Sequence, residues 1–202
     1  MQMNNNRIAI FGTIKECMLD YVNWFNNEIC ADHLSSFADF ALSLRDVLTW
    51  VQFIADTYKK DKTFNLWEAY LHGASLMHLD GLGLGTGLSN DDAKRTKLQA
   101  RGMLLKQITE HSPNSLSDNF EKEEQRNVSP VYGEKFFGIH PFQIPIGPET
   151  ILKNSSFKMS APTTALNLRR VLRAMQISKP ILLEGSPGVG KTRYAFYIIH
   201  NL

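Results

Sequence analysis

The chain has 202 residues, of which 43% are hydrophobic and 21% charged, as in an ordinary globular protein of one or two modest domains. Its 22 basic and 20 acidic residues leave a formal net charge of +2, a field too weak to signal a nucleic acid or an anionic membrane as partner. Cys17 and Cys30 have no metal-type spacing, and neither a signal peptide nor a bilayer-length apolar run is visible, so we expect a soluble protein without membrane contact in a reducing compartment.

The first half of the chain predicts helices. Apolar residues recur every three or four positions over 7–30 and over 65–79, which is the helical period. Residues 91–111 are expected to form a further, exposed helix that begins at "NDDAKR". Another helix is expected to begin at Ser43, because Asp46 follows three residues later as in a capping box. Its predicted core-facing residues are Leu44, Val47, Leu48, Val51 and Ile54.

Alternating glycines interrupt this helical pattern at 80–88, with Gly81, Gly83, Gly85 and Gly87. A dinucleotide-binding loop needs glycines at G-x-G-x-x-G spacing between a strand and a helix. These glycines follow a helix and do not have that spacing, so we interpret the segment as a loop that ends the helix.

The composition changes after this region. Residues 112–135 are polar and proline-punctuated, which predicts a linker. Residues 136–149 predict an edge strand, because prolines are tolerated at sheet edges. A helix is expected over 164–177, with Arg169, Arg170 and Arg173 mostly off its apolar face and exposed to water.

The most specific motif lies near the C-terminus. The apolar run 181–183 predicts a strand buried in a parallel sheet. The next eight residues fit the P-loop pattern G-x-x-x-x-G-K-[ST] at every specified position. They are Gly185, Ser186, Pro187, Gly188, Val189, Gly190, Lys191 and Thr192.

Each residue type in this motif has a physical purpose. The glycines permit a tight turn in which consecutive N–H groups can surround an anion. Lys191 can place its ammonium against the β- and γ-phosphates of ATP, and the Thr192 hydroxyl can ligate Mg²⁺. ATP and Mg²⁺ are therefore the expected ligands.

Hydrolysis needs more than this loop, including an acidic strand end that usually follows it in the sequence. Only ten residues follow Thr192, and they contain neither this Walker B element nor a sensor 1 residue. We therefore do not expect the chain to hydrolyse ATP alone, and we interpret it as an excerpt of a longer ATPase.

A resemblance to a known family rests on three segments: "SLRDVLTWVQFI" followed by "LWEAYLHGASLMHLDGLG", then "FFGIHPFQIPIGPE", and finally residues 160–192. Together they resemble the midasin family of dynein-like AAA+ ATPases. The resemblance implies an α/β AAA+ P-loop fragment: a mostly helical lid domain at 1–111, a linker at 112–135, and the beginning of an αβα nucleotide-binding core at 136–202.

The resemblance also implies a cellular role. Midasins are taken to remodel precursors of the large ribosomal subunit and to release assembly factors in the nucleolus and nucleoplasm. The implied partners are neighbouring AAA+ modules of the same ring, the pre-ribosomal particle and its assembly factors. The alternatives are a non-catalytic module that senses nucleotide or binds a ring, and part of a MoxR-type AAA+ chaperone.

Arg45 has a candidate role by the same resemblance. In AAA+ lids an arginine called sensor 2, at the start of a late helix, approaches the nucleotide phosphates, and Arg45 has that place in "SLRD". A cation in the first turn of a helix opposes the macrodipole, so an anion nearby would be favourable. The alternative is that Arg45 is solvated or pairs with a neighbouring acid.

Overall fold

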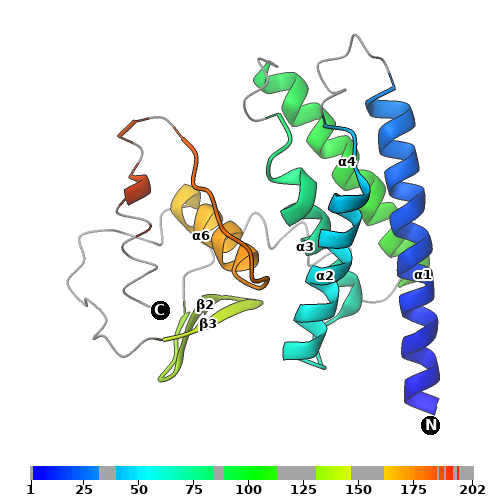
Figure 1. The fold of residues 1–202 in the computed structure, drawn as a ribbon, viewed down its shortest axis with the longest axis horizontal. Helices are drawn as coiled ribbons and strands as arrows, with labels where there is room; N and C mark the ends of the chain where they lie inside the picture. The colour runs from blue at the N-terminus through cyan, green and yellow to red at the C-terminus, as the bar shows by residue number, and fades with distance from the viewer. Residues whose placement is uncertain are drawn as a thin grey trace. The chain divides into compact units, whose positions relative to one another are not determined.

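The computed structural model describes residues 2–31, 40–83, 89–112, 131–146, 162–185, 187–188, 190–192 and 195. The chain divides into two compact units, residues 1–120 and residues 121–202 (Figure 1). Within these described ranges no helix combines the length and the apolar character needed to cross a membrane.

Unit 1 is helical, as the sequence predicts. Its α-helices are α1 (Gln2–Trp24), α2 (Leu44–Lys60), α3 (Leu66–Ala74) and α4 (Asn90–His111). Two of them continue into single π-helical turns, α1 into η1 (Phe25–Ile29) and α3 into η3 (Ser75–Leu79). The helices expected over 7–30, from 43, over 65–79 and over 91–111 are therefore confirmed.

Side chains with oxygen acceptors determine where these helices begin. The Asp46 carboxylate accepts hydrogen bonds from the Ser43 backbone N–H at 2.8 Å and from the Ser43 hydroxyl at 2.7 Å. Asn65 Oδ1 accepts from the Trp67 N–H at 2.8 Å at the start of α3. Such caps satisfy backbone donors that the first helical turn leaves without partners.

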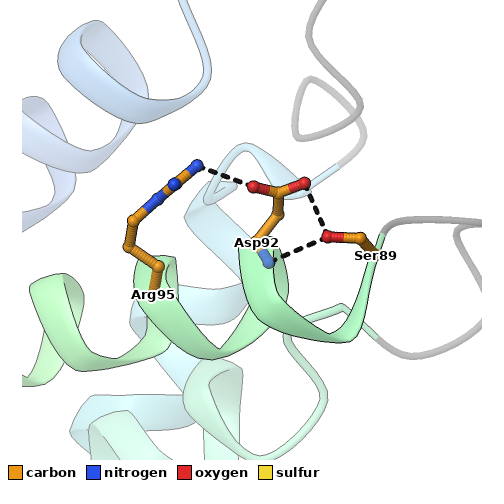
Figure 2. A network of polar contacts seen from close by, with 3 residues as sticks. All are labelled: Ser89, Asp92 and Arg95. Atoms are coloured by element: carbon orange, nitrogen blue, oxygen red, sulfur yellow. Dashed lines mark hydrogen bonds and ion pairs between the residues drawn. The ribbon is translucent and has the colours of Figure 1, made fainter.

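Figure 2 shows the equivalent arrangement at α4. Ser89 Oγ accepts from the Asp92 N–H at 3.0 Å and donates to Asp92 Oδ2 at 2.7 Å, while Arg95 pairs with Asp92 Oδ1 at 2.6 Å. The Arg95 and Asp92 side chains are 78% and 43% exposed, so the ion pair itself contributes little and the cap determines the helix start.

The core of unit 1 is built from aromatic side chains. Trp50 stacks on Tyr70 with ring centroids 4.7 Å apart, and Tyr21 meets Trp50 edge-on at 5.7 Å. The Trp50 indole N–H donates to the Tyr70 carbonyl at 2.7 Å. Stacked and edge-on rings fix relative helix positions more specifically than aliphatic contacts do.

The predicted core face of α2 is wrong at three positions. Its buried residues are Trp50, Phe53, Ile54 and Thr57. Leu44, Leu48 and Val51 are 74%, 59% and 48% exposed. The apolar period identifies a face of a helix but not what covers it, and in α2 the larger aromatic residues take the side toward α3.

Unit 2 contains a small antiparallel sheet with strand order β1 (Val131–Tyr132), β2 (Phe136–Ile139) and β3 (Phe142–Pro145). The single edge strand expected over 136–149 is thus a hairpin that turns at His140 and Pro141. β1 comes from the end of the polar segment predicted as a linker, so residues 131–132 belong to this sheet. The predicted helix is confirmed as α6 (Pro162–Ala174), which packs on β2 and β3.

Two of the three α6 arginines are not on a wet face, contrary to the sequence-based expectation. Arg169 and Arg173 are 4% and 3% exposed, and the Arg173 guanidinium carbon lies 6.0 Å from the centre of the Phe142 ring. Long arginine stems can be buried with their charged ends on an aromatic face, which a count of apolar residues does not register.

The prediction of a buried strand at 181–183 is also wrong. These residues have no strand assignment, and Ile181 and Leu182 are 40% and 79% exposed. A parallel strand exists only when neighbouring strands satisfy its backbone N–H and C=O groups. The described part of unit 2 has its three strands in the antiparallel sheet instead, so the expected beginning of an αβα core is not seen there.

Candidate nucleotide-binding site

The glycines described in the loop 185–192 have positive φ angles. Gly185, Gly188 and Gly190 have φ angles of 155°, 82° and 84°, in the range that residues with a side chain rarely adopt. A Cβ at Gly188 would meet no atom within 4 Å, so this glycine is required by conformation and not by crowding. Ser186 and Val189 lie outside the described residues.

Lys191 follows the last of these glycines. Its ammonium donates a hydrogen bond of 2.5 Å to the carbonyl of Gly185, six residues earlier. The side chain therefore folds back across the loop, and the positive charge lies at the loop's own start. An anion held by the loop would meet this ammonium directly.

Thr192 is helical and exposed beside Lys191. A hydroxyl oxygen is among the hard ligands that Mg²⁺ prefers, and in nucleotide sites Mg²⁺ keeps several waters and phosphate oxygens as its other ligands. The donor set therefore fits Mg²⁺ only when it is bound together with phosphate. Among the described residues there is no group of three or more His, Cys, Asp or Glu side chains that could hold a metal ion.

Arg45 lies in unit 1, in the first turn of α2, and is exposed. Its neighbour Asp46 is engaged by the backbone N–H and hydroxyl of Ser43. Thr49 donates to the Arg45 carbonyl at 2.9 Å, a contact that leaves the guanidinium itself uninvolved. Arg45 thus lies on the surface of unit 1, whereas the loop belongs to unit 2.

The glycine-rich segment at 80–88 is described only as far as Gly83. Gly83 has a φ of 83°, and a Cβ there would overlap the Cβ of Ala93 on α4. This glycine lets the chain pass close to α4 after η3 ends, which agrees with a helix-terminating loop. Residues 84–88 of this segment lie outside the described part of the chain.

Comparison with known proteins identifies the first half of the chain. Residues 5–80, which include most of α1 and all of α2, α3 and η3, match the family described as the midasin AAA+ ATPase lid domain. Midasin of Dictyostelium discoideum is 39% identical over 172 residues, and midasin of Giardia intestinalis is 33% identical over 164 residues. The chain belongs to the midasin family.

The match to these midasins covers 75% and 76% of the chain but only 3% of each relative. The helical domain is thus the lid of an AAA+ module, as the resemblance implies. No solved structure matches the chain.

Sequence analysis missed the exposed apolar residues of α2. It assigned Leu44, Leu48 and Val51 to the core. The same sequence also has a second, bulkier set of residues at helical spacing, and this set is the buried one: Trp50, Phe53, Ile54 and Thr57. A helix with two apolar faces is typical of a helix that is covered on both sides.

Proposed function

We propose that this chain is an ATP-binding part of a midasin-type AAA+ ATPase that remodels pre-ribosomal large-subunit particles and releases assembly factors from them. Membership of the midasin family supports the class of machine. Three further points are inferred from the family resemblance: the role in ribosome assembly, the nuclear location and the partnership with neighbouring AAA+ modules of a ring.

The observation that carries the proposal is the loop at 185–192. It combines a complete P-loop sequence with three glycines at positive φ and a lysine that reaches across the loop. Backbone N–H groups of such a loop point toward bound phosphates. Lys191 would contact the terminal phosphates of ATP, and Thr192 would hold Mg²⁺, which neutralises phosphate charge when bound.

Arg45 is proposed as a sensor 2 residue that serves the module to which this lid belongs. Its exposed guanidinium in the first turn of α2 supports this role, because the macrodipole disfavours a cation there unless an anion is close. ATP bound to the ATPase core would supply that anion.

A test of the cellular role uses full-length protein carrying Lys191→Ala, with Lys179→Ala as a matched control because Lys179 is an exposed lysine before the loop. Pre-ribosomal particles are purified from cells and their assembly factors are quantified. We expect particles from Lys191→Ala cells to retain assembly factors and those from Lys179→Ala cells to match wild type. Wild-type particles in Lys191→Ala cells would contradict the proposal.

A further inference from the structure

The side chain of Asn26 holds the chain just before α2. Asn26 is the second residue of the π-helical turn η1, and its amide bonds to the backbone of Leu42. The Leu42 N–H donates to Asn26 Oδ1 at 2.7 Å, and Asn26 Nδ2 donates to the Leu42 carbonyl at 3.0 Å. A side-chain amide that both accepts from and donates to one residue pairs with it as a neighbouring strand residue would. We call these two bonds the Asn26 clamp.

The Asn26 clamp has a rigid base in the core of unit 1. A hydrogen bond of 3.1 Å from the Cys30 N–H to the Phe25 carbonyl closes the π-helical turn. Phe25 is 0% exposed and packs edge-on against His78 of η3, with ring centroids 4.3 Å apart. A single π-helical turn is rare and frequently accompanies a functional site. This turn buries Phe25 and directs the amide of the next residue to Leu42.

The start of α2 is supported from another helix as well as by its own cap. Caps formed by Asn65 and Ser89 begin α3 and α4, and they bond to N–H groups two and three residues later. α2 has its cap at Ser43 and, one residue earlier, the Asn26 clamp, which joins residues 16 positions apart. The clamp therefore fixes the place of the first turn of α2 relative to η1.

Arg45 lies in this first turn, two residues after the cap. Its carbonyl accepts a hydrogen bond from the Thr49 hydroxyl at 2.9 Å, and its side chain is exposed. The backbone under the Arg45 side chain is thus held on both sides. Groups that act on a reacting ligand need such support, because a displacement of about 1 Å can lower a rate about a hundredfold.

We propose that Asn26 is a positioning residue for ATP turnover, which acts through Arg45 by fixing the first turn of α2 against η1. Loss of the Asn26 amide releases Leu42 and displaces Arg45 without removing it. The effect on turnover rests on the sensor role proposed for Arg45 above, whereas the clamp itself does not.

Hydrogen exchange tests the clamp in the 202-residue chain. The Leu42 amide proton is bonded to Asn26 Oδ1, so its exchange measured by NMR should be at least about tenfold faster in Asn26→Ala. Asn27→Ala is the control, since Asn27 is the next residue of η1 and is exposed, and it should leave this rate unchanged. An unchanged rate at Leu42 in Asn26→Ala would overturn the proposal.

A double-mutant cycle tests whether Asn26 acts through Arg45. The kcat/KM for ATP is measured in full-length protein with Asn26→Ala, with Arg45→Ala and with both. We expect Asn26→Ala to lower kcat/KM at least about threefold and the double variant to match Arg45→Ala alone, because residues that act as a unit are not additive. Losses that multiply in the double variant would show a merely structural role and would overturn the proposal.

Two further outcomes separate this proposal from the sensor role. An unchanged kcat/KM in Asn26→Ala, together with a loss in Arg45→Ala, would overturn the positioning role alone. An unchanged kcat/KM in Arg45→Ala would refute the sensor role and with it the route from Asn26 to turnover. If Asn26→Ala is unfolded by circular dichroism, Asn26→Asp takes its place in the cycle, because it keeps the acceptor for the Leu42 N–H and loses the donor to the Leu42 carbonyl.

Discussion

The hydroxyl of Tyr70 on α3 donates a 2.6 Å hydrogen bond to Oε1 of Gln107 on α4. The amide nitrogen of Gln107 in turn donates to the backbone carbonyl of Cys17 on α1 at 2.9 Å. Tyr70 and Gln107 are 0% and 5% exposed. One glutamine thus joins three helices of the lid through buried polar groups, and its length and chemistry are both needed.

Gln107→Leu should destabilise the lid by about 1–3 kcal/mol, because it leaves the buried Tyr70 hydroxyl without its acceptor, whereas the Cys17 carbonyl lies inside α1. Gln99→Ala is the control, since Gln99 is exposed on the same helix and such changes stay within about 0.5 kcal/mol. Urea unfolding followed by tryptophan fluorescence gives both values. Equal stability of Gln107→Leu and wild type would refute the role of this network.

Replacement by alanine should have opposite effects on the stability of the lid at two helical glycines. A Cβ at Gly73 on α3 would overlap Trp50 Cδ1 and lie 2.9 Å from its Nε1, and this ring is held by its hydrogen bond to the Tyr70 carbonyl. Gly73→Ala should therefore cost about 1–3 kcal/mol through overpacking.

A Cβ at Gly102 on α4 meets no atom within 4 Å. Gly102→Ala should therefore stabilise the lid by about 0.5–1 kcal/mol, since alanine loses less backbone entropy than glycine in a helix. Thermal unfolding of both variants checks the pair. Equal unfolding temperatures for Gly73→Ala and Gly102→Ala would contradict the predicted overpacking against Trp50.

His78 makes lid stability depend on pH. Burial lowers the pKa of His78 from 6.5 to about 4, and this exceeds the opposing effect of Asp46, while Lys97 lowers the pKa further. The ring is 6% exposed and packs edge-on against Phe25, with centroids 4.3 Å apart. The folded lid therefore holds His78 neutral at pH values where the unfolded chain protonates it.

The sign of the effect follows from this depressed pKa. The contribution of neutral His78 is fully present above pH 6.5 and is lost as the pH falls toward 4, at about 1.4 kcal/mol per pH unit. His78→Phe should remove this part of the slope between pH 6.5 and 4.5, whereas His111→Gln at an exposed position should keep it. Denaturant unfolding at pH 7 and pH 5 measures the slopes, and parallel slopes for wild type and His78→Phe would contradict the prediction.

The sequence predicted helices better than it predicted their surroundings. Ser43 and Asp46 marked the start of α2 correctly, because a cap depends on residues close together in the chain. Which side of α2 is buried depends on its packing against α3, and the buried side is the one with Trp50 and Phe53. Arg173 escaped prediction for a similar reason, since its burial depends on the Phe142 ring 6.0 Å away.

In the candidate site, too, the local backbone was predicted correctly and the longer-range structure was not. The P-loop sequence predicted a tight turn at its glycines, and Gly185, Gly188 and Gly190 have positive φ angles in the structure, because glycine usage reports local backbone conformation. The strand expected just before the loop, at 181–183, needs neighbouring strands, and no local pattern reveals whether these are present. Nucleotide binding by the loop is a prediction that chemistry must test.

The most direct test uses an acyl-phosphate derivative of ATP, which transfers its acyl group to a lysine beside the terminal phosphate. Full-length protein is treated with this probe with and without excess MgATP, and acylation of the peptides containing Lys191 and Lys179 is quantified by mass spectrometry. We predict strong acylation of Lys191 that MgATP suppresses, weaker suppression in Thr192→Ala, and no effect of MgATP on Lys179. Acylation of Lys191 at the same level with and without MgATP would contradict ATP binding by this loop.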